Sequence, residues 1–231
     1  MPDFSKRSRE VEIMDNFTLD HRELDPVLKE LEVINKLLGG FSVFYDAFRQ
    51  LDLQNGNSVC DWGCGGGDSL RVLEGYFRRR GLNMRLIGVD ATAAAVEFAR
   101  ERNRAFRNME FRHADVLEHE FGQNEFDVVV SSLFTHHFDD KQWILLIRKM
   151  VHASRKAVII NDLHRHWFAY HSIGMLTSLF SRSPMVKHDS KISVLRSFRK
   201  SELEDLIRCA GFRRFTIKWM WAFRWQIIIY K

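Results

Sequence analysis

The chain is poor in cysteine and has no long apolar run. Its three cysteines, Cys60, Cys64 and Cys209, are odd in number, and the C-x3-C spacing of the first two matches no zinc motif. We therefore expect reduced thiols in a cytoplasmic protein. The charged N-terminus lacks the apolar core of a signal peptide, and the least polar stretch, 167–180, is too short to span a bilayer. No membrane anchor is expected.

A strong excess of one charge sign is also missing. Thirty-five Lys and Arg residues against 30 Asp and Glu give a net charge of +5, and the basic residues are spread out except at 78–80 and 100–112. Such short runs are typical of a solvated helix face rather than a nucleic-acid surface. The 231 residues, 45% of them hydrophobic, fit one α/β domain with room for a small cap or insertion.

A glycine-rich loop follows the first predicted strand, in the run Ser58-Val-Cys-Asp-Trp-Gly-Cys-Gly-Gly-Gly-Asp68. Glycines let a cofactor approach the backbone where a side chain would collide. The next strand ends at Asp90, 23 residues past Gly67, where a carboxylate can accept hydrogen bonds from both hydroxyls of a ribose. The dinucleotide pattern G-x-G-x-x-G fails because its last position, counted from Gly63, is Asp68. The loop therefore indicates a nucleotide-type cofactor of another kind.

Strands and helices alternate after a helical N-terminal part. Residues 1–17 show no periodicity and are expected to be loosely ordered, Asp25-Pro26 is expected to open a helix that ends at Gly39-Gly40, and a second helix is expected over 42–51. Short apolar strands joined by helices predict a parallel sheet covered on both faces, with an antiparallel hairpin at its end. Strands are predicted at 58–62, 85–89, 109–113, 126–131, 157–161, 213–219 and 224–230, and helices at 68–80, 92–104, 140–152 and 200–210.

The order of these motifs resembles that of the class I S-adenosylmethionine-dependent methyltransferases over residues 57–231. Asp61-x-Gly63-x-Gly65-x-Gly67 resembles the family's first motif, His113-Ala-Asp115-Val116 the segment after strand three, and Phe126 to Ser132 strand four and its exit. The resemblance implies a Rossmann-like, seven-stranded, mostly parallel sheet with a reversed terminal strand. It divides the chain into an N-terminal helical cap (1–52) and a methyltransferase domain (53–231), with 163–199 as an insertion over the acceptor.

The resemblance also implies that S-adenosyl-L-methionine is the cofactor. Asp61 and the glycines would hold its methionine part, Asp90 its ribose and Asp115 with Val116 its adenine, while Ser131 would lie beside the sulfonium. The expected cofactor-binding residues are Asp61, Gly63, Cys64, Gly65, Gly67, Asp90, Ala91, Asp115, Val116 and Ser131.

Two groups of histidines follow strands four and five. His136 and His137 are the candidates for a general base, with packing of the loop as their alternative role, and in an extended segment at most one of them would face the site. Asp162, His164 and His166 would share one face if extended, as a metal site, a substrate-orienting set or polar residues capping the next helix. Because no further acidic partner is visible, a required metal is rejected. His188-Asp189 is expected to be a surface pair.

Motifs of other methyltransferases are missing. The exit of strand four reads Ser131-Ser-Leu-Phe134, without the proline pair of nucleic-acid amino methyltransferases. No cysteine follows a proline, as the cytosine-C5 enzymes require, and no paired glutamates of the arginine enzymes are present. A small-molecule acceptor is therefore the expected partner, with neither nucleic acid nor membrane.

The aromatic insertion fits a lid over an organic substrate. The runs Asn35 to Gly40 and His188 to Phe198 are similar to small bacterial methyltransferases of polyketide and aromatic natural products, which implies O-methylation of a phenolic or enolic hydroxyl. An inactive cofactor-binding accessory protein and, less well supported, a nicotinamide oxidoreductase are the alternatives. The oligomeric state is left open, with a homodimer as one option.

Overall fold

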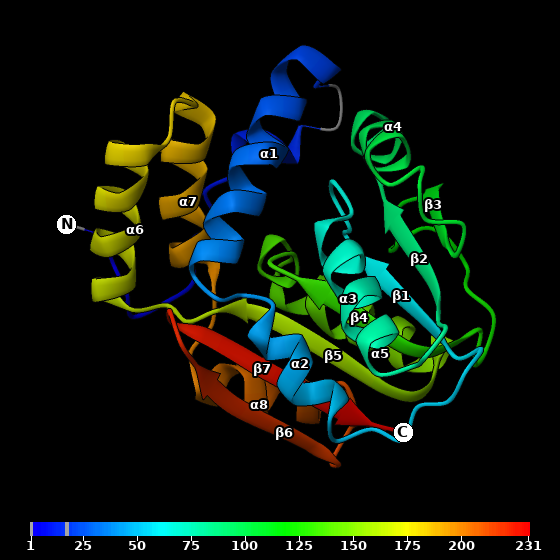
Figure 1. Ribbon diagram of the computed structural model, residues 1–231. Helices are drawn as coiled ribbons and strands as arrows, with labels where there is room; N and C mark the ends of the chain where they lie inside the picture. The colour runs from blue at the N-terminus through cyan, green and yellow to red at the C-terminus, as the bar shows by residue number, and fades with distance from the viewer. Residues whose placement is uncertain (1, 17–18) are drawn as a thin grey trace.

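The structure, a computed structural model, describes residues 2–16 and 19–231. Within these residues seven strands form one sheet in the order β3-β2-β1-β4-β5-β7-β6 (Figure 1). Strands β1 to β5 run parallel, and β7 pairs antiparallel with both β5 and β6. The predicted Rossmann-like sheet with a reversed terminal strand is confirmed. The strands are β1 Ser58–Trp62, β2 Arg85–Asp90, β3 Met109–His113, β4 Phe126–Ser132, β5 Ser154–Leu163, β6 Phe215–Met220 and β7 Arg224–Tyr230.

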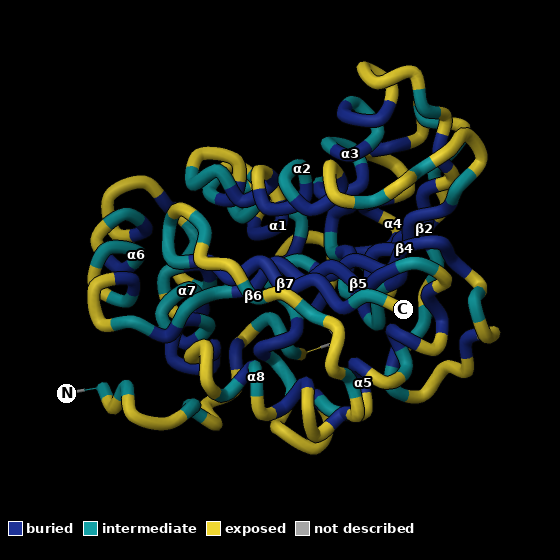
Figure 2. The backbone as a smooth tube through the Cα atoms, turned by 90° about the horizontal axis from the view of Figure 1, so that it is seen from below, coloured by how far each residue is buried: buried dark blue, intermediate teal, exposed yellow. Residues whose placement is uncertain are grey.

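The central strands form the buried middle layer of the molecule (Figure 2). Every residue of β1 is buried, and β4, β5 and β7 are buried along nearly their whole length. Apolar residues on both faces are what a parallel sheet covered by helices requires. The edge strand β6 instead alternates between half-buried and exposed residues, because only one of its faces is packed.

Helices cover both faces of the sheet, as expected. On one face α2 (Ser42–Phe48), α3 (Asp68–Arg79) and α4 (Ala93–Arg102) pack through residues such as Phe44, Leu73 and Val96. On the other face α5 (Asp140–Ala153) and α8 (Lys200–Cys209) lie against β1, β4, β5 and β7.

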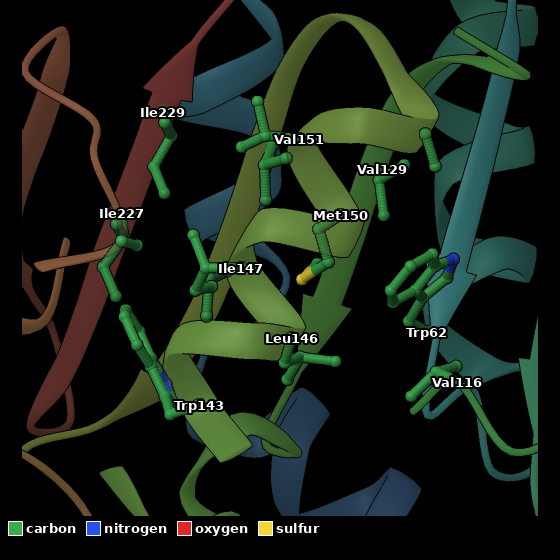
Figure 3. Packing of buried hydrophobic residues seen from close by; sticks show 14 of the residues in the cluster. Trp62, Val116, Val129, Trp143, Leu146, Ile147, Met150, Val151, Ile227 and Ile229 are labelled. Carbon is green, nitrogen blue, oxygen red and sulfur yellow. The ribbon is translucent and has the colours of Figure 1, made fainter. Parts of the chain in front are cut away.

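Helix α5 shows how the sequence produces this packing. It begins with a capping box, in which the side chain of Asp139 accepts from the amide of Gln142 at 2.9 Å and the side chain of Gln142 accepts from the amide of Asp139 at 3.2 Å. Its apolar stripe then points at the sheet, where Trp143 lies near Ile227 of β7 and Met150 near Val129 of β4 (Figure 3). Fixing α5 in this way fixes the loop that leaves β4, which lines the site described below.

Helix α1 (His21–Leu37) begins earlier than the sequence suggests. Its N-cap is Asp20, whose carboxylate accepts from the amides of Arg22 and Glu23, so the predicted cap at Asp25 is wrong and Pro26 lies inside the helix. The extra turn is stabilised by packing, since Leu24 is buried in a small cluster with Phe98 of α4. The helix ends near Gly39, as predicted.

The insertion after β5 contains two helices rather than one, α6 (Trp167–Phe180) and α7 (Pro184–Arg196). They pack together, and α7 also contacts α1, so the three helices stand side by side over the carboxyl ends of the strands (Figure 1). Residues 2–16 are not loosely ordered as expected, because they run across α7 and form a short turn, η1 (Ile13–Asp15). Phe17, the last residue of that expectation, lies outside the described residues.

In the described part of the chain, no helix combines the length and apolar character needed to cross a bilayer. Cys60 and Cys64 are buried and Cys209 is exposed, and all three thiols are free.

Candidate active site

A cavity of about 910 Å³ opens at the carboxyl ends of β1, β2, β4 and β5. One end is formed by the glycine loop and by the segments that follow β2 and β3. The other end lies between α1, α6, α7 and the turn joining β6 to β7. Helices α1, α6 and α7 thus close over the sheet edge at which parallel α/β sheets bind ligands.

The glycine loop turns sharply under the cavity. Gly63, Gly65 and Gly67 all have positive φ (72°, 48° and 73°), a region that glycine enters without steric cost. A Cβ on Gly63 would lie 2.3 Å from the ring of Phe134. Gly63, Cys64, Gly65 and Gly66 line the cavity, whereas Gly67 is the N-cap of α3 and faces the ring of Phe111. Cys64 contributes its backbone, since its sulfur would lie 2.8 Å from a Cβ on Gly88 in the sheet.

Three carboxylates gather around this loop. Asp61 is buried, and within the described residues its Oδ1 atom has no hydrogen-bond partner. Burial, and then the charges of Asp68 and Asp90, raise the pKa of Asp61 well above its usual range. Burial likewise raises the pKa of Asp68 and of Asp90, both of which line the cavity, whereas Asp61 lies behind the glycine loop and is not among the lining residues. This end of the cavity is therefore built to receive positive charge.

Of the other expected cofactor-binding residues, most line the cavity, but Ser131 does not. The Asp90 carboxylate accepts from the amides of Gly65 and Thr92, both at 2.9 Å, which ties strand β2 to the glycine loop. Ala91 and Val116 line the cavity, and Asp115 lies exposed at its rim. Ser131 is fully buried and donates to the carbonyl of Trp62 at 2.9 Å.

Ser131 is not among the residues that line the cavity. The next two residues, Ser132 and Leu133, line it in its place. Leu133 has a φ of 52°, an uncommon value for a branched side chain. This turn leads the chain from β4 into the short helix η2 (Thr135–His137).

His136 and His137 both line the cavity, so the expectation that at most one faces the site is wrong. The reason is η2, because a tight helical turn places successive side chains closer together than an extended strand does. The two rings stack with centroids 4.5 Å apart. Asp162 accepts from Nδ1 of His136 at 2.6 Å, and Asp15 accepts from Nδ1 of His137 at 2.5 Å.

A third carboxylate, Glu12, faces both rings. Its Oε1 atom lies 3.5 Å from Nε2 of His136, and its Oε2 atom lies 4.0 Å from Nε2 of His137. Burial by itself lowers the pKa of His136, but the charge and hydrogen bond of Asp162, together with Glu12, outweigh it and raise the pKa to about 9. Arg196 donates to Asp15 at 2.6 Å and also to the backbone carbonyl of His137.

The side chains of Asp162, His164 and His166 do not point at a common site. Asp162 faces Thr135 and His136, whereas His164 packs 4.7 Å from the ring of Trp225 and 5.4 Å from that of His166. Burial, with the nearby charges of His166 and Arg165, lowers the pKa of His164 to about 4. His166 is the N-cap of α6, accepting from the amide of Phe168, as the capping interpretation predicted. His188 pairs with Asp189 at 2.8 Å, but Asp189 is buried rather than at the surface.

Arg224 is a buried cation on the cavity wall. Within the described residues its guanidinium makes one long hydrogen bond, in which Nη1 donates to Oδ1 of Asn161 at 3.5 Å, and its Nε has no partner. Burial lowers its pKa to about 10 despite the charge of Asp162. The Oδ1 atom of Asn35, on the same wall, is also buried and unpaired there. A buried guanidinium with so little compensation is suited to bind an anionic group.

The walls between Arg224 and the histidines are apolar. The turn before β7 carries Ala222 and Phe223 at φ values of 60° and 55°, a conformation that costs about 1–2 kcal/mol per residue. The turn brings Trp221 and Phe223 into the lining of the cavity. The apolar lining residues at this end are Leu31, Ile34, Leu38, Phe168, Ile173, Leu176, Trp219, Trp221 and Phe223.

Sequence reasoning missed Glu12, Asp15, Arg196 and Arg224. The first two lie in a segment without periodicity. Arg196 sits close to Arg199 and Lys200, and Arg224 stands between two aromatic residues at the start of a predicted strand. The spacing Glu12 to Asp15 before a helix was the one local sign of order, because such pairs are common where a turn begins.

Comparison with known proteins agrees with this geometry. A model of the methyltransferase domain family matches residues 59–157. Phosphoethanolamine N-methyltransferase 1 of Triticum aestivum is 35% identical over 106 residues, which are 45% of this chain and 20% of that protein. The matched region therefore spans about a fifth of the length of this curated relative.

Solved structures share the fold over most of the chain. A SAM-dependent methyltransferase from Aquifex aeolicus covers 92% of this chain and 99% of its own, with a TM-score of 0.65 and 14% identity. The plantazolicin methyltransferase BamL, solved with a triazolic desmethylPZN analog and SAH, covers 86% of this chain and 68% of its own, with a TM-score of 0.55 and 20% identity. Residues 59–157 therefore match the methyltransferase domain family, and the chain has the fold of the solved SAM-dependent methyltransferases, with S-adenosylmethionine as the methyl donor.

Proposed function

We propose that the protein transfers the methyl group of S-adenosylmethionine to a hydroxyl oxygen of a small, largely apolar acceptor such as a phenol or an enol. One observation carries the proposal: a single cavity has the acidic glycine loop at one end and a histidine pair beside apolar walls at the other. An in-line transfer needs donor and acceptor in one enclosed space.

The cofactor half uses residues of the sheet edge. Asp61 and Asp68 attract the amino group of the methionine part, Asp90 accepts from the ribose hydroxyls, and Asp115 with Val116 holds the adenine. The Arg224 guanidinium complements the methionine carboxylate. Ser132, rather than Ser131, is the proposed neighbour of the sulfonium, because it lines the cavity.

Most of the acceptor half comes from segments that lie outside the matched family region, whereas its histidine pair lies within that region. We assign residues 1–52 to a cap and 163–199 to a lid, which together supply the apolar walls and exclude water. His136 and His137 lie at this end and promote loss of the proton from the acceptor hydroxyl. When bound, the cofactor supplies a methyl group already activated by its sulfonium charge.

The step balances without an oxidant or reductant. The acceptor O–H bond breaks, an oxygen lone pair forms the new O–CH₃ bond, and the electron pair of the C–S bond returns to sulfur. The products are a methyl ether, S-adenosylhomocysteine and a proton. Positioning of this kind contributes about 7–11 kcal/mol in favourable cases.

N-methylation of an amine is the second candidate, because the wheat relative is named for that activity. The apolar walls and the histidine pair favour a hydroxyl instead, since a protonated amine would be poorly solvated between Trp219, Phe223 and Leu176.

The test is a transfer assay with methyl-labelled S-adenosylmethionine against phenols, polyketides, quinone precursors and amines, including phosphoethanolamine. Mass spectrometry and NMR identify the methylated atom. We expect label on the oxygen of an aromatic or enolic acceptor. Label on nitrogen would contradict O-methylation, and S-adenosylhomocysteine binding without transfer to any acceptor would favour an accessory protein.

A further inference from the structure

Glu12, His136 and His137 converge from two distant parts of the chain. The carboxylate lies just before η1, and the two imidazoles lie in η2. One side-chain atom from each lies within 4.8 Å of the other two, on the wall of the cavity. This pattern of two histidines and one carboxylate is a common ligand set for divalent transition metals.

A second layer of carboxylates orients both rings. A carboxylate can only accept, so the contacts of 2.6 Å from His136 to Asp162 and 2.5 Å from His137 to Asp15 place a proton on each Nδ1. With Nδ1 engaged by a carboxylate, Nε2 is the ring nitrogen left to bind a metal ion, which would displace any proton held there. Histidine ligands of metals are held in this way, by a carboxylate on the ring nitrogen that does not bind the metal.

The inner atoms are buried and unpaired. Among the described residues, neither Oε1 of Glu12 nor Nε2 of His136 has a hydrogen-bond partner, although both side chains are about 98% buried or more. Burying a polar atom without a partner destabilises the folded protein. Two such atoms 3.5 Å apart are placed for a ligand that bonds to both.

We propose that Glu12, His136 and His137 bind one divalent transition-metal ion, of the zinc, cobalt or manganese type, at the acceptor end of the cavity. Bonds of about 2.0–2.2 Å to such an ion separate neighbouring ligand atoms by roughly 3.0–3.6 Å. The 3.5 Å and 4.0 Å separations reach this range with small side-chain shifts. Nitrogen donors favour these ions over magnesium or calcium, which prefer oxygen.

The inference deepens the proposed function and rests on it for the ion's role. Three protein ligands leave a coordination position open toward the cavity, where the acceptor hydroxyl would sit. A cation there eases loss of the hydroxyl proton, which passes to water before the oxygen attacks the methyl carbon. Arg196, 4.0 Å from Glu12, offsets part of the negative charge, so we expect micromolar rather than picomolar affinity.

The test uses the full chain, stripped with a chelator and titrated with cobalt(II) chloride under visible absorption and calorimetry. We expect one equivalent of cobalt per chain. Glu12→Gln and His137→Gln should weaken binding more than about 100-fold, and Asp15→Asn about 10–100-fold, the usual effect of an outer partner. His152→Gln, on the exposed end of α5, is the matched control and should bind as the parent does.

Absence of saturable cobalt binding at millimolar concentration would overturn the inference. Binding that is equally tight in Glu12→Gln and His137→Gln would overturn it too. S-adenosylhomocysteine affinity, measured on the same samples, reports folding and separates the two proposals. Loss of cobalt binding alone leaves the methyltransferase proposal standing, whereas a parent protein that binds no S-adenosylhomocysteine contradicts that proposal.

Discussion

Asp61, Asp68 and Asp90 are carboxylates that burial brings together under the glycine loop. Their raised pKa values mean that the folded, unliganded protein holds protons at a pH where an unfolded chain has released them. Stability therefore falls as the pH rises above the ordinary carboxyl range near about 4. A bound cationic cofactor instead stabilises the ionised form of these carboxylates, because it pairs with their negative charge.

We therefore predict that affinity for S-adenosylmethionine falls as the pH drops from about 8 to about 5. Calorimetric titration across this range measures it. In Asp61→Asn the affinity should be lower at high pH and should depend less on pH. An affinity that is the same at both ends of the range in the parent protein would contradict the role given to these carboxylates.

Arg224 leads to a second prediction at this scale. Its guanidinium is buried with one long hydrogen bond, so it should gain most from a carboxylate ligand. Arg224→Gln should lower the affinity for S-adenosylhomocysteine by about 10–100-fold, which corresponds to the loss of one charge-assisted hydrogen bond of about 1.5–3 kcal/mol. Calorimetry with 5′-methylthioadenosine, which has no carboxylate, should show the same affinity in both proteins.

Arg213→Gln is the matched control, because this arginine is exposed and does not line the cavity. If Arg224→Gln weakened the binding of both ligands equally, the arginine would not bind the carboxylate of the methionine part.

The histidine pair marks the limit of prediction for single residues. The position of His136 and His137 after strand four was predictable from the motif order. Their joint orientation was not, because it depends on the positive φ of Leu133 and on Asp162, which accepts from the backbone and ring of His136. Neither feature has a local signal in the sequence.

Among the elements, the two glycines that flank α3 allow backbone strain to be distinguished from side-chain packing. Gly67 and Gly81 flank the helix at similar φ, 73° and 71°. A Cβ on Gly67 would lie 2.7 Å from the ring of Phe111, whereas one on Gly81 would have no atom within 4 Å. The two positions therefore differ in space and not in backbone conformation.

We predict that Gly81→Ala lowers the free energy of unfolding by about 1 kcal/mol, from strain alone. Gly67→Ala should cost about 2–4 kcal/mol, because overpacking adds to the same strain. Urea unfolding followed by circular dichroism measures both. Equal losses in the two variants would show that the ring of Phe111 moves aside freely.

Element prediction worked best where the pattern was locally determined. The strands of the sheet follow from short apolar runs bounded by turns, and their order follows from the motifs. The start of α1 was wrong because Asp25-Pro26 is a good local cap, yet packing of Leu24 against Phe98 stabilises an earlier turn that Asp20 caps. Both Asp20 and Asp25 are acceptable N-caps, and the packing of α1 against α4 favours Asp20.

On the scale of the whole molecule, the N-terminal segment lines part of the cavity through residues such as Glu12 and Asp15. Arg7 donates to the carbonyls of Arg196 and Phe138 at 2.7 and 2.8 Å and to the carboxylate of Asp140 at 2.8 Å. It thereby links the segment that carries Glu12 and Asp15 to both η2 and α7. Contacts between residues more than a hundred positions apart cannot be predicted from one sequence, which is why Glu12 was missed.

Arg7→Ala should release this segment while leaving the cofactor half intact. We predict that amide hydrogen exchange in residues 8–15 speeds up by about tenfold or more, since each lost hydrogen bond to a charged group contributes about 1.5–3 kcal/mol. Affinity for S-adenosylhomocysteine should not change. Arg9→Ala, at an exposed position in the same segment, is the control. Unchanged exchange in Arg7→Ala would mean that other contacts hold the segment in place.

The most direct test of the account is a crystal structure of the protein grown with S-adenosylhomocysteine. The account predicts an adenosine between Asp90 and Val116, a methionine part over Gly63 and Gly65, and a sulfur that faces the wall of Ser132, His136 and His137. A ligand bound elsewhere, or a sulfur that points away from the histidine pair, would contradict it.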